Sequence, residues 1–174
     1  MPQTPENGRY AGLPPVIGSE AAVLILGSFP SIQSLAAQEY YGNPQNQFWR
    51  IMGALDLADP HDPYPVRCRS LTSRGVALWD VIASCRREGS GDAAIRDPVP
   101  NPVPGLLAMH PGIRLVVLNG KGGAGRWFAR FFPELAGGVA PRVAILPSTS
   151  PAHARLSLSA KVREWQIVSR HATT

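Results

Sequence analysis

The run A-V-L-I-L-G at residues 22–27, followed directly by S-F-P-S at residues 28–31, decides the fold. A continuous apolar run with no polar alternation is typical of a strand that is buried on both faces, as parallel strands are. The Ser and Pro that follow the glycine are turn residues and end the strand. The stretch therefore predicts a parallel sheet whose strands open into loops at their carboxyl ends.

The same form recurs three times along the chain. Short runs rich in Val, Leu and Ile, each ended by a polar or turn residue, occupy residues 75–80, 114–120 and 142–148. Between the runs, apolar residues recur at helical spacing. The helical positions are Phe48, Ile51, Met52 and Leu55; Trp127, Phe128, Phe131 and Phe132; and Leu158, Val162, Trp165 and Val168. This alternation predicts an α/β fold with a central four-stranded, mainly parallel sheet flanked by helices and joined by right-handed crossovers.

The chain length predicts one domain. A chain of 174 residues can bury a sizeable core but is too short for two well-packed domains, so we expect a single domain over residues 1–174. Residues 1–12 are expected to be a flexible N-terminal segment. Prolines fix φ and lack the N–H donor, so the stretch D-P-V-P-N-P-V-P-G at residues 97–105 is predicted to be a semi-rigid surface loop.

Composition narrows the class of protein. Hydrophobic residues make up 44% and charged residues 17%, which is the balance of a soluble globular protein. No apolar run approaches the length of a membrane span, and the first ten residues lack the regions of a secretion signal, so we expect a cytoplasmic protein. Cys68 and Cys85 are too few for a disulfide framework, a zinc site or an iron–sulfur cluster. No metal and no cofactor are expected.

The basic charge is compatible with a polyanionic partner. The formal net charge is +5, and Lys121 and Lys161 are the only lysines among the 17 Lys and Arg residues. An arginine-rich surface suits phosphate contacts. Because a preference for arginine also arises from genomic base composition, charge alone leaves such a partner open.

The loops after the strands are expected to carry the chemistry, as in other open α/β sheets. N-G-K-G-G-A-G at residues 119–125 lacks the spacing of a phosphate-binding loop and of a dinucleotide fingerprint. Ser148, Ser150 and His153 do not suggest a serine hydrolase, because the chain has no G-x-S-x-G elbow and all three lie on one predicted loop.

What remains at the strand ends is a set of aromatic, amide and hydroxyl side chains with almost no carboxylate. The aromatic residues are Phe29, Tyr40, Tyr41, Phe48 and Trp49, and the amides are Asn43, Asn46 and Asn119. Such a set predicts a pocket for a flat polar ring such as a nucleobase. The alternative is that the aromatics belong to the core and the asparagines to turns, and core packing is favoured for Phe48 and Trp49.

These motifs, in this order, resemble those of the uracil-DNA glycosylase superfamily, specifically its DNA-deoxyinosine (hypoxanthine-DNA) glycosylase branch. The resemblance covers about residues 13–165. The matching segments are residues 27–31, 40–49, 75–90 with 95–101, 116–121 and 146–158. It implies a uracil-DNA glycosylase-like fold and a DNA repair enzyme. The implied activity is hydrolysis of the N-glycosidic bond of a deaminated base in DNA, above all hypoxanthine.

The resemblance also implies a catalytic amide. Elsewhere in the superfamily an Asp or Asn stands two positions after the glycine of the first loop, where this chain has Phe29, which cannot polarise water. The resembled branch places a catalytic asparagine in the segment at residues 40–49. Asn46 is preferred because it precedes a Phe-Trp pair, and Asn43 is the alternative. Since an amide does not titrate, its role would be to position water and a base edge.

The remaining site residues follow from the same resemblance. The base pocket is expected to contain Gly27, Ser28, Phe29, Pro30, Tyr41, Phe48 and Asn119. Tyr41 would stack on the extruded base, and Asn119 would read a base edge or support a loop. The residues expected to contact DNA are Ser148, Thr149, Ser150, Pro151 and His153. His153 is equally compatible with a structural role, and the roles of Asp80 and Lys121 stay open.

The expected enzyme is monofunctional and leaves an abasic site, because few amines are available to form a Schiff base. Its partner would be DNA containing deaminated bases, with no membrane and no metal, and it would act as a monomer associated with the nucleoid. Two alternatives stay open. One is a broad glycosylase of the same fold that prefers uracil or xanthine. The other, suggested by Phe29, is a catalytically silent module that binds DNA lesions.

Overall fold

Four parallel strands form the central sheet in the computed structural model, which describes residue 5 and residues 7–173. The strand order is β3-β2-β6-β7. The strands are β2 (Val23–Gly27), β3 (Val76–Asp80), β6 (Leu115–Asn119) and β7 (Arg142–Leu146). Each lies within one of the four apolar runs, so the predicted four-stranded parallel sheet is confirmed.

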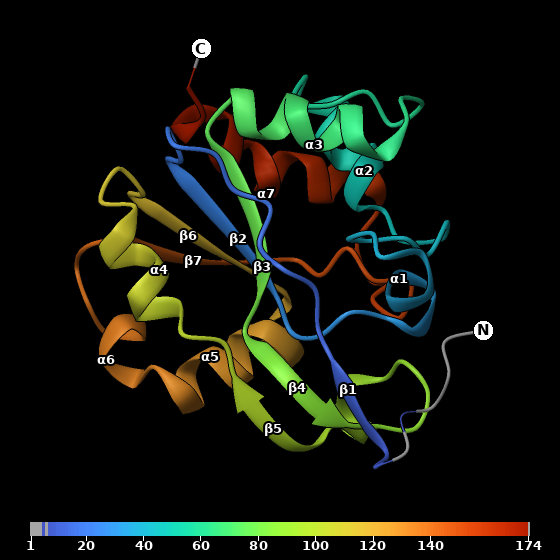
Figure 1. The fold of residues 1–174 in the computed structure, drawn as a ribbon. Helices are drawn as coiled ribbons and strands as arrows, with labels where there is room; N and C mark the ends of the chain where they lie inside the picture. The colour runs from blue at the N-terminus through green and yellow to red at the C-terminus, as the bar shows by residue number, and fades with distance from the viewer. Residues whose placement is uncertain (1–4, 6, 174) are drawn as a thin grey trace.

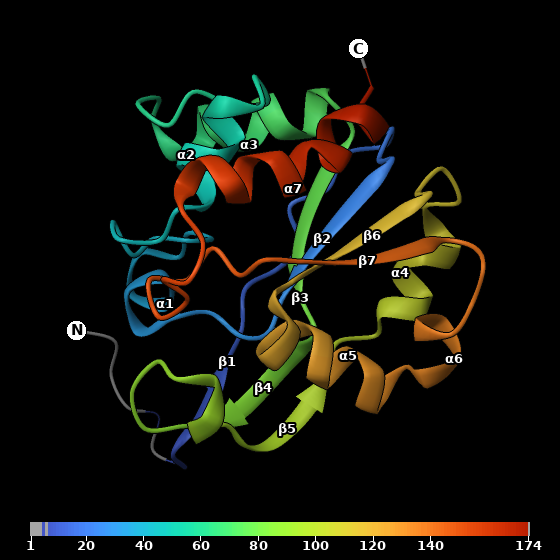
Figure 2. The same ribbon diagram turned by 180° about the vertical axis from the view of Figure 1, so that it is seen from behind.

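Helices cover both faces of this sheet. On one face lie α2 (Phe48–Ala54), α3 (Tyr64–Ser73) and α7 (Leu158–His171), while α1 (Ile32–Ala37) follows β2 beyond its carboxyl end. On the other lie α4 (Val103–Met109), α5 (Arg126–Phe131) and α6 (Pro133–Ala136). Figures 1 and 2 show α2, α3 and α7 together at one side of the strands and α4, α5 and α6 at the other. No helix in the described part of the chain is long and apolar enough to cross a membrane.

A second, antiparallel sheet was not predicted. It has the order β1-β4-β5 and consists of β1 (Arg9–Ala11), β4 (Ile82–Arg86) and β5 (Arg96–Pro100). Only Val81 separates β3 from β4, so the chain passes directly from one sheet to the other. This sheet lies beyond the carboxyl end of β3 (Figure 1).

Two predictions need correction. Residues 1–12 were predicted to be flexible, but residues 9–11 form β1, because they pair with β4. Residues 1–4 and 6 lie outside the described residues. Residues 97–105 are not a loop throughout, since they contribute to β5 and to the start of α4. The prolines are tolerated there because β5 is an edge strand and because the first turn of a helix needs no N–H donors.

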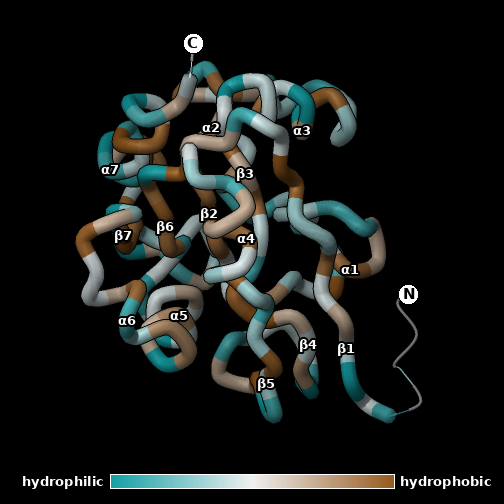
Figure 3. Tube along the Cα trace, turned by 60° about the vertical axis from the view of Figure 1, so that its left-hand side comes forward, coloured by the Kyte–Doolittle hydropathy of each residue, from teal (hydrophilic) through white to brown (hydrophobic). Residues whose placement is uncertain are grey.

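The core lies between the central sheet and the helices. Every residue of β2 and β3 is buried, and the hydrophobic colouring follows the central strands (Figure 3). Phe48 and Trp49 are 0% and 7% exposed, so they belong to the core. The Phe48 ring packs edge-on against Trp165 of α7, with 6.2 Å between the ring centroids. This contact fixes the start of α2 next to the carboxyl ends of the strands.

Candidate active site at the carboxyl ends of the strands

A cavity of ≈ 480 Å³ opens where the central strands end. It contains every predicted site residue except Phe48 and His153. Its lining consists of Gly27, Ser28, Phe29, Pro30, Ser31, Ser34, Tyr40, Tyr41, Asn43, Asn46, Asp80, Ser90, Gly91, Asp92, Asn119, Ser148, Thr149, Ser150, Pro151 and Ala152. Loops that are distant in sequence therefore meet at one place, as expected for the carboxyl edge of a parallel sheet.

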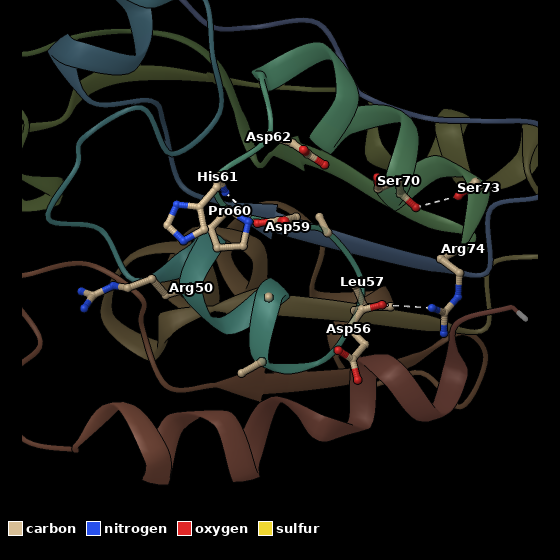
Figure 4. A pocket seen from close by; sticks show the side chains of 13 residues that line it. Arg50, Asp56, Leu57, Asp59, Pro60, His61, Asp62, Ser70, Ser73 and Arg74 are labelled. Atoms are coloured by element: carbon tan, nitrogen blue, oxygen red, sulfur yellow. Dashed lines mark hydrogen bonds between the residues drawn. The ribbon is translucent and has the colours of Figure 1, made fainter.

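A larger cavity of ≈ 730 Å³ lies elsewhere, between α2, α3 and the residues that connect them (Figure 4). Arg50, His61 and Arg74 are among its lining residues, and Arg74 donates a hydrogen bond to the main-chain oxygen of Asp56 at 3.1 Å. None of the predicted site residues lies in it, and no Phe, Tyr or Trp lines it. We therefore place the candidate site in the smaller cavity, which is lined by Phe29, Tyr40 and Tyr41.

The Tyr41 ring lines the smaller cavity and is supported from one side. It is stacked on Phe48, with 3.9 Å between the centroids and 20° between the planes. Phe48 is fully buried, so it supports Tyr41 from behind and does not itself line the cavity. One face of the Tyr41 ring is therefore covered by Phe48. Burial, with the nearby charge of Asp80, raises the pKa of the Tyr41 hydroxyl, which keeps it protonated.

Asn119, at the end of β6, is hydrogen-bonded to two other segments that line the cavity. Its Nδ2 donates to Thr149 Oγ1 at 3.0 Å and to the Tyr41 hydroxyl at 3.3 Å, and its Oδ1 accepts from the Thr149 N–H at 3.0 Å. The main-chain oxygen of Thr149 in turn accepts from the N–H of Gln47 at 2.9 Å. These contacts favour loop support over base reading, because the amide already has protein partners.

Asn43 and Asn46 both line the cavity and both close a local turn. Asn46 Oδ1 accepts from the N–H of Phe48 at 2.9 Å, and Asn43 Oδ1 accepts from the N–H of Gln45 at 3.0 Å. In the part of the chain that the structure describes, neither Nδ2 donates to a protein group. With their oxygens held by the backbone, both amides have a fixed orientation and can present an N–H donor to a ligand.

Two carboxyl groups line the cavity, so the prediction of almost no carboxylate there is wrong. Asp80, at the end of β3, is 4% exposed, and among the described residues its Oδ2 has no hydrogen-bond partner. Burial, and then the negative charge of Asp92, raises the pKa of Asp80 to about 7, while Arg87 lowers it. Desolvation disfavours the charged form of an acid, so Asp80 holds its proton to much higher pH than an exposed aspartate.

Asp92 lies in the short helical turn Asp92–Ala94 between β4 and β5. Its Oδ1 accepts a hydrogen bond from Ser28 Oγ at 2.5 Å, the short distance typical of a hydroxyl bound to a carboxylate. Gly123 faces the same carboxylate and leaves room for it, since a Cβ there would collide with Oδ2. Sequence reasoning missed Asp92 because the strands on either side of it were not predicted.

Phe29 packs against the buried Arg87. The guanidinium carbon lies 5.1 Å from the centroid of the Phe29 ring, and Nη2 donates to the main-chain oxygen of Pro30 at 2.5 Å. Burial lowers the pKa of Arg87. The Phe29 ring thus contacts the Arg87 guanidinium next to the loop at residues 27–31. The ring offers no polar group to a water molecule.

His153 lies outside the cavity. Its main-chain oxygen accepts from Lys161 Nζ at 2.7 Å, and the same amine donates to Gln47 Oε1 at 2.8 Å. Lys161 is 1% exposed, and burial lowers its pKa. Lys161 therefore ties the loop at residues 148–155 to the residue that precedes α2. Within residue 5 and residues 7–173, no group of three or more His, Cys, Asp or Glu side chains is placed to hold a metal ion.

Comparison with known proteins shows the family of this chain. The family model described as Uracil DNA glycosylase superfamily matches residues 14–167. A protein of Methanosarcina acetivorans named Hypoxanthine DNA glycosylase is 38% identical over 161 residues, which are 92% of this chain and 98% of that one. A protein of the same name from Methanosarcina barkeri is 39% identical over 114 residues, 65% of this chain and 72% of the other.

A solved structure is also similar. The solution NMR structure assigned as a uracil DNA glycosylase from Methanosarcina acetivorans superposes with a TM-score of 0.78 at 35% sequence identity. The match covers 94% of this chain and 98% of that one. The central sheet and its flanking helices are therefore an arrangement already seen in a solved structure.

Proposed function

Because the chain belongs to the uracil DNA glycosylase superfamily, we propose that it is a hypoxanthine DNA glycosylase, which hydrolyses the N-glycosidic bond of the deaminated base and leaves an abasic site. One observation supports this most directly. The cavity at the strand ends combines the stacking face of Tyr41 with the amides of Asn43 and Asn46, in a chain similar over nearly its whole length to a protein named Hypoxanthine DNA glycosylase.

The cavity suits a base that has left the DNA stack. Enzymes that act on a base in duplex DNA extrude the nucleotide and hold the base by stacking and by hydrogen bonds to its edge. Tyr41 supplies the stacking surface, and its rigid support by Phe48 keeps the ring in place before the base arrives. A deaminated base in a mismatched pair costs less to extrude than a paired one, which adds selectivity.

Bond cleavage develops positive charge on the deoxyribose and negative charge on the departing base. Amide and main-chain N–H donors stabilise the leaving base in a site closed to bulk water. In this proposal Asn46 positions the attacking water, and Asn43 is the alternative. Since an amide cannot act as a strong base, the site suits a good leaving group such as hypoxanthine and suits adenine poorly.

The product is an abasic site without a strand break. A lyase needs an amine at the reacting sugar, and neither lysine lines the cavity. The Lys161 amine is buried and makes two hydrogen bonds to protein groups. The proposed partner is therefore DNA that contains a deaminated base, contacted by residues 148 and 150–152 at the cavity rim. The predicted DNA contact of Thr149 is wrong, because this side chain is 0% exposed and hydrogen-bonded to Asn119.

Single-turnover release of base tests the proposal. Duplexes carrying hypoxanthine or uracil are incubated with wild-type protein and with Asn46→Ala, Asn43→Ala and Gln45→Ala variants. Gln45 is exposed and lies between the two asparagines, so it is the matched control. We expect the wild type to release hypoxanthine, Asn46→Ala to release it about 100-fold more slowly, and Gln45→Ala to resemble the wild type.

Three other outcomes would change the catalytic residue, the base preference or the enzyme assignment. Loss in Asn43→Ala with normal release by Asn46→Ala would assign the catalytic amide to Asn43. Faster release of uracil than of hypoxanthine would favour a broad glycosylase. Binding of both duplexes without any release by the wild type would contradict the enzyme assignment and favour a module that recognises lesions.

A further inference from the structure

The proposed mechanism leaves Asp80 and Asp92 without a role, although both line the cavity. A buried carboxyl oxygen without a hydrogen-bond partner among the described residues, such as Asp80 Oδ2, is costly unless it binds something. The described part of the chain has one ion pair, between Arg86 and Asp97, and it involves neither of these residues. Within the described residues, neither of the two carboxyl groups is therefore held in an ion pair.

The chemistry of deamination indicates which ligand atom a carboxylate would recognise. Adenine and cytosine present a ring nitrogen that accepts a hydrogen bond, next to an exocyclic amine that donates. Deamination reverses this pattern, because the product carries a ring N–H donor next to a carbonyl oxygen. An ionised carboxylate accepts hydrogen bonds and cannot donate, so it attracts the ring N–H and repels the lone pair of the parent base.

Asp92 is the better placed of the two carboxylates. Ser28, from the loop after β2, donates to its Oδ1, and its Oδ2 packs against Gly123, where a Cβ would collide with it. In the part of the chain that the structure describes, Oδ2 makes no hydrogen bond. Asp80 is 4% exposed, so it is less accessible to a ligand than the half-buried Asp92; burial, and then the charge of Asp92, raises the pKa of Asp80.

We propose that the Asp92 carboxylate, oriented by the Ser28 hydroxyl, accepts a hydrogen bond from the ring N–H that a deaminated base carries and its parent base lacks. This inference rests on the proposed function and assigns its selectivity to Asp92. The residue reaches the cavity from the antiparallel sheet, so selectivity and catalysis come from different parts of the fold.

The test compares two bases that differ at the atoms in question. Unsubstituted purine has the ring system of hypoxanthine but lacks the N1–H and the carbonyl oxygen. Duplexes carrying either base on a 2′-fluorinated sugar, which resists cleavage, are titrated with wild type and with Asp92→Asn. The variant keeps an oxygen for Ser28 but loses the negative charge. We expect the preference of the wild type for hypoxanthine over purine to fall by about 10-fold or more in Asp92→Asn.

Two further variants separate recognition from folding. Asp97→Asn makes the same chemical change at a side chain that is 74% exposed, and it should leave the preference unchanged. Ser28→Ala removes the orienting hydroxyl and should lower the preference by a smaller factor than Asp92→Asn. A structural role for Asp92 would weaken binding of both duplexes equally, and an unchanged preference in Asp92→Asn would overturn the assignment.

The failure of this inference is distinct from the failure of the proposed function. If the wild type does not release hypoxanthine from an unmodified duplex, the proposed function fails. If the wild type releases hypoxanthine and Asp92→Asn keeps the full preference for hypoxanthine over purine, only the role of Asp92 fails.

Discussion

The substitution Gly27→Ala probes the floor of the cavity with a single methyl group. Gly27 is the last residue of β2, and a Cβ there would lie 2.6 Å from Asp80 Oδ1 and 3.4 Å from the Tyr41 hydroxyl. The first distance is far below van der Waals contact. Asp80 is a short, buried side chain, so it cannot rotate away into solvent.

The expected cost follows from this collision. Overpacking a buried site by one methyl group costs about 1–3 kcal/mol. In urea, with about 1–3 kcal/mol per molar of denaturant, that cost corresponds to a fall of the unfolding midpoint by about 1 M. Release of hypoxanthine should fall more steeply, by about 100-fold, because displacement of Asp80 and Tyr41 by a fraction of an ångström disturbs the bound base.

The matched control is Gly105→Ala in α4. A Cβ at residue 105 meets only the Cβ of Pro102, at 4.0 Å, so the position has room for it. Alanine is a better helix former than glycine, and we expect stabilisation by about 0.5–1 kcal/mol with normal activity. A Gly27→Ala protein with the midpoint and the activity of the wild type would refute the placement of Asp80 against this strand end.

Three further expectations follow from the site. The pKa of Asp80 is raised from 3.8 to about 7, so the native state holds a proton that the unfolded state releases near pH 4. The free energy of unfolding should therefore fall by at most about 4 kcal/mol as pH rises from 4 to 7. Urea titrations at several pH values should show a smaller fall for Asp80→Asn. Asn119→Ala leaves the buried N–H of Thr149 without its acceptor and should lower the free energy of unfolding by about 1–3 kcal/mol in urea, so an unchanged midpoint would contradict the network. Because neither Lys121 nor Lys161 lines the cavity, borohydride treatment during turnover should trap no protein–DNA adduct, and strands should break only after heat or alkali.

The central sheet was predictable because its signal is local. Residues 22–27 are apolar without interruption, and only a strand covered on both faces can bury them all, as β2 does. The same reasoning found the other three central strands. Since parallel strands end at a common edge, the loops after them were also expected to meet, and Asn46, Asn119 and Thr149 do line one cavity.

The antiparallel sheet was not predictable because its signal is weak. β5 contains two prolines and lies mostly at the surface, and β1 has three residues, so neither shows the alternation of a half-buried strand. Asp92 depends on this sheet for its place beside Ser28, and therefore its role was hidden too. The contacts of Asn119 were not predictable either, because the sequence does not show which hydrogen-bond donors and acceptors of an amide are already bonded to protein groups.

The junction at Val81 has a consequence for how the chain tolerates insertions. Val81 alone separates β3 from β4. Its N–H donates to the main-chain oxygen of Gly27, and its main-chain oxygen accepts from the N–H of Asn101. An inserted residue would turn the side chains of β4 to the opposite face and displace the loop that carries Asp92. A library of single-residue insertions scanned along the chain should therefore have no active members at this junction, while insertions beside Val139, which is 94% exposed, should be accepted.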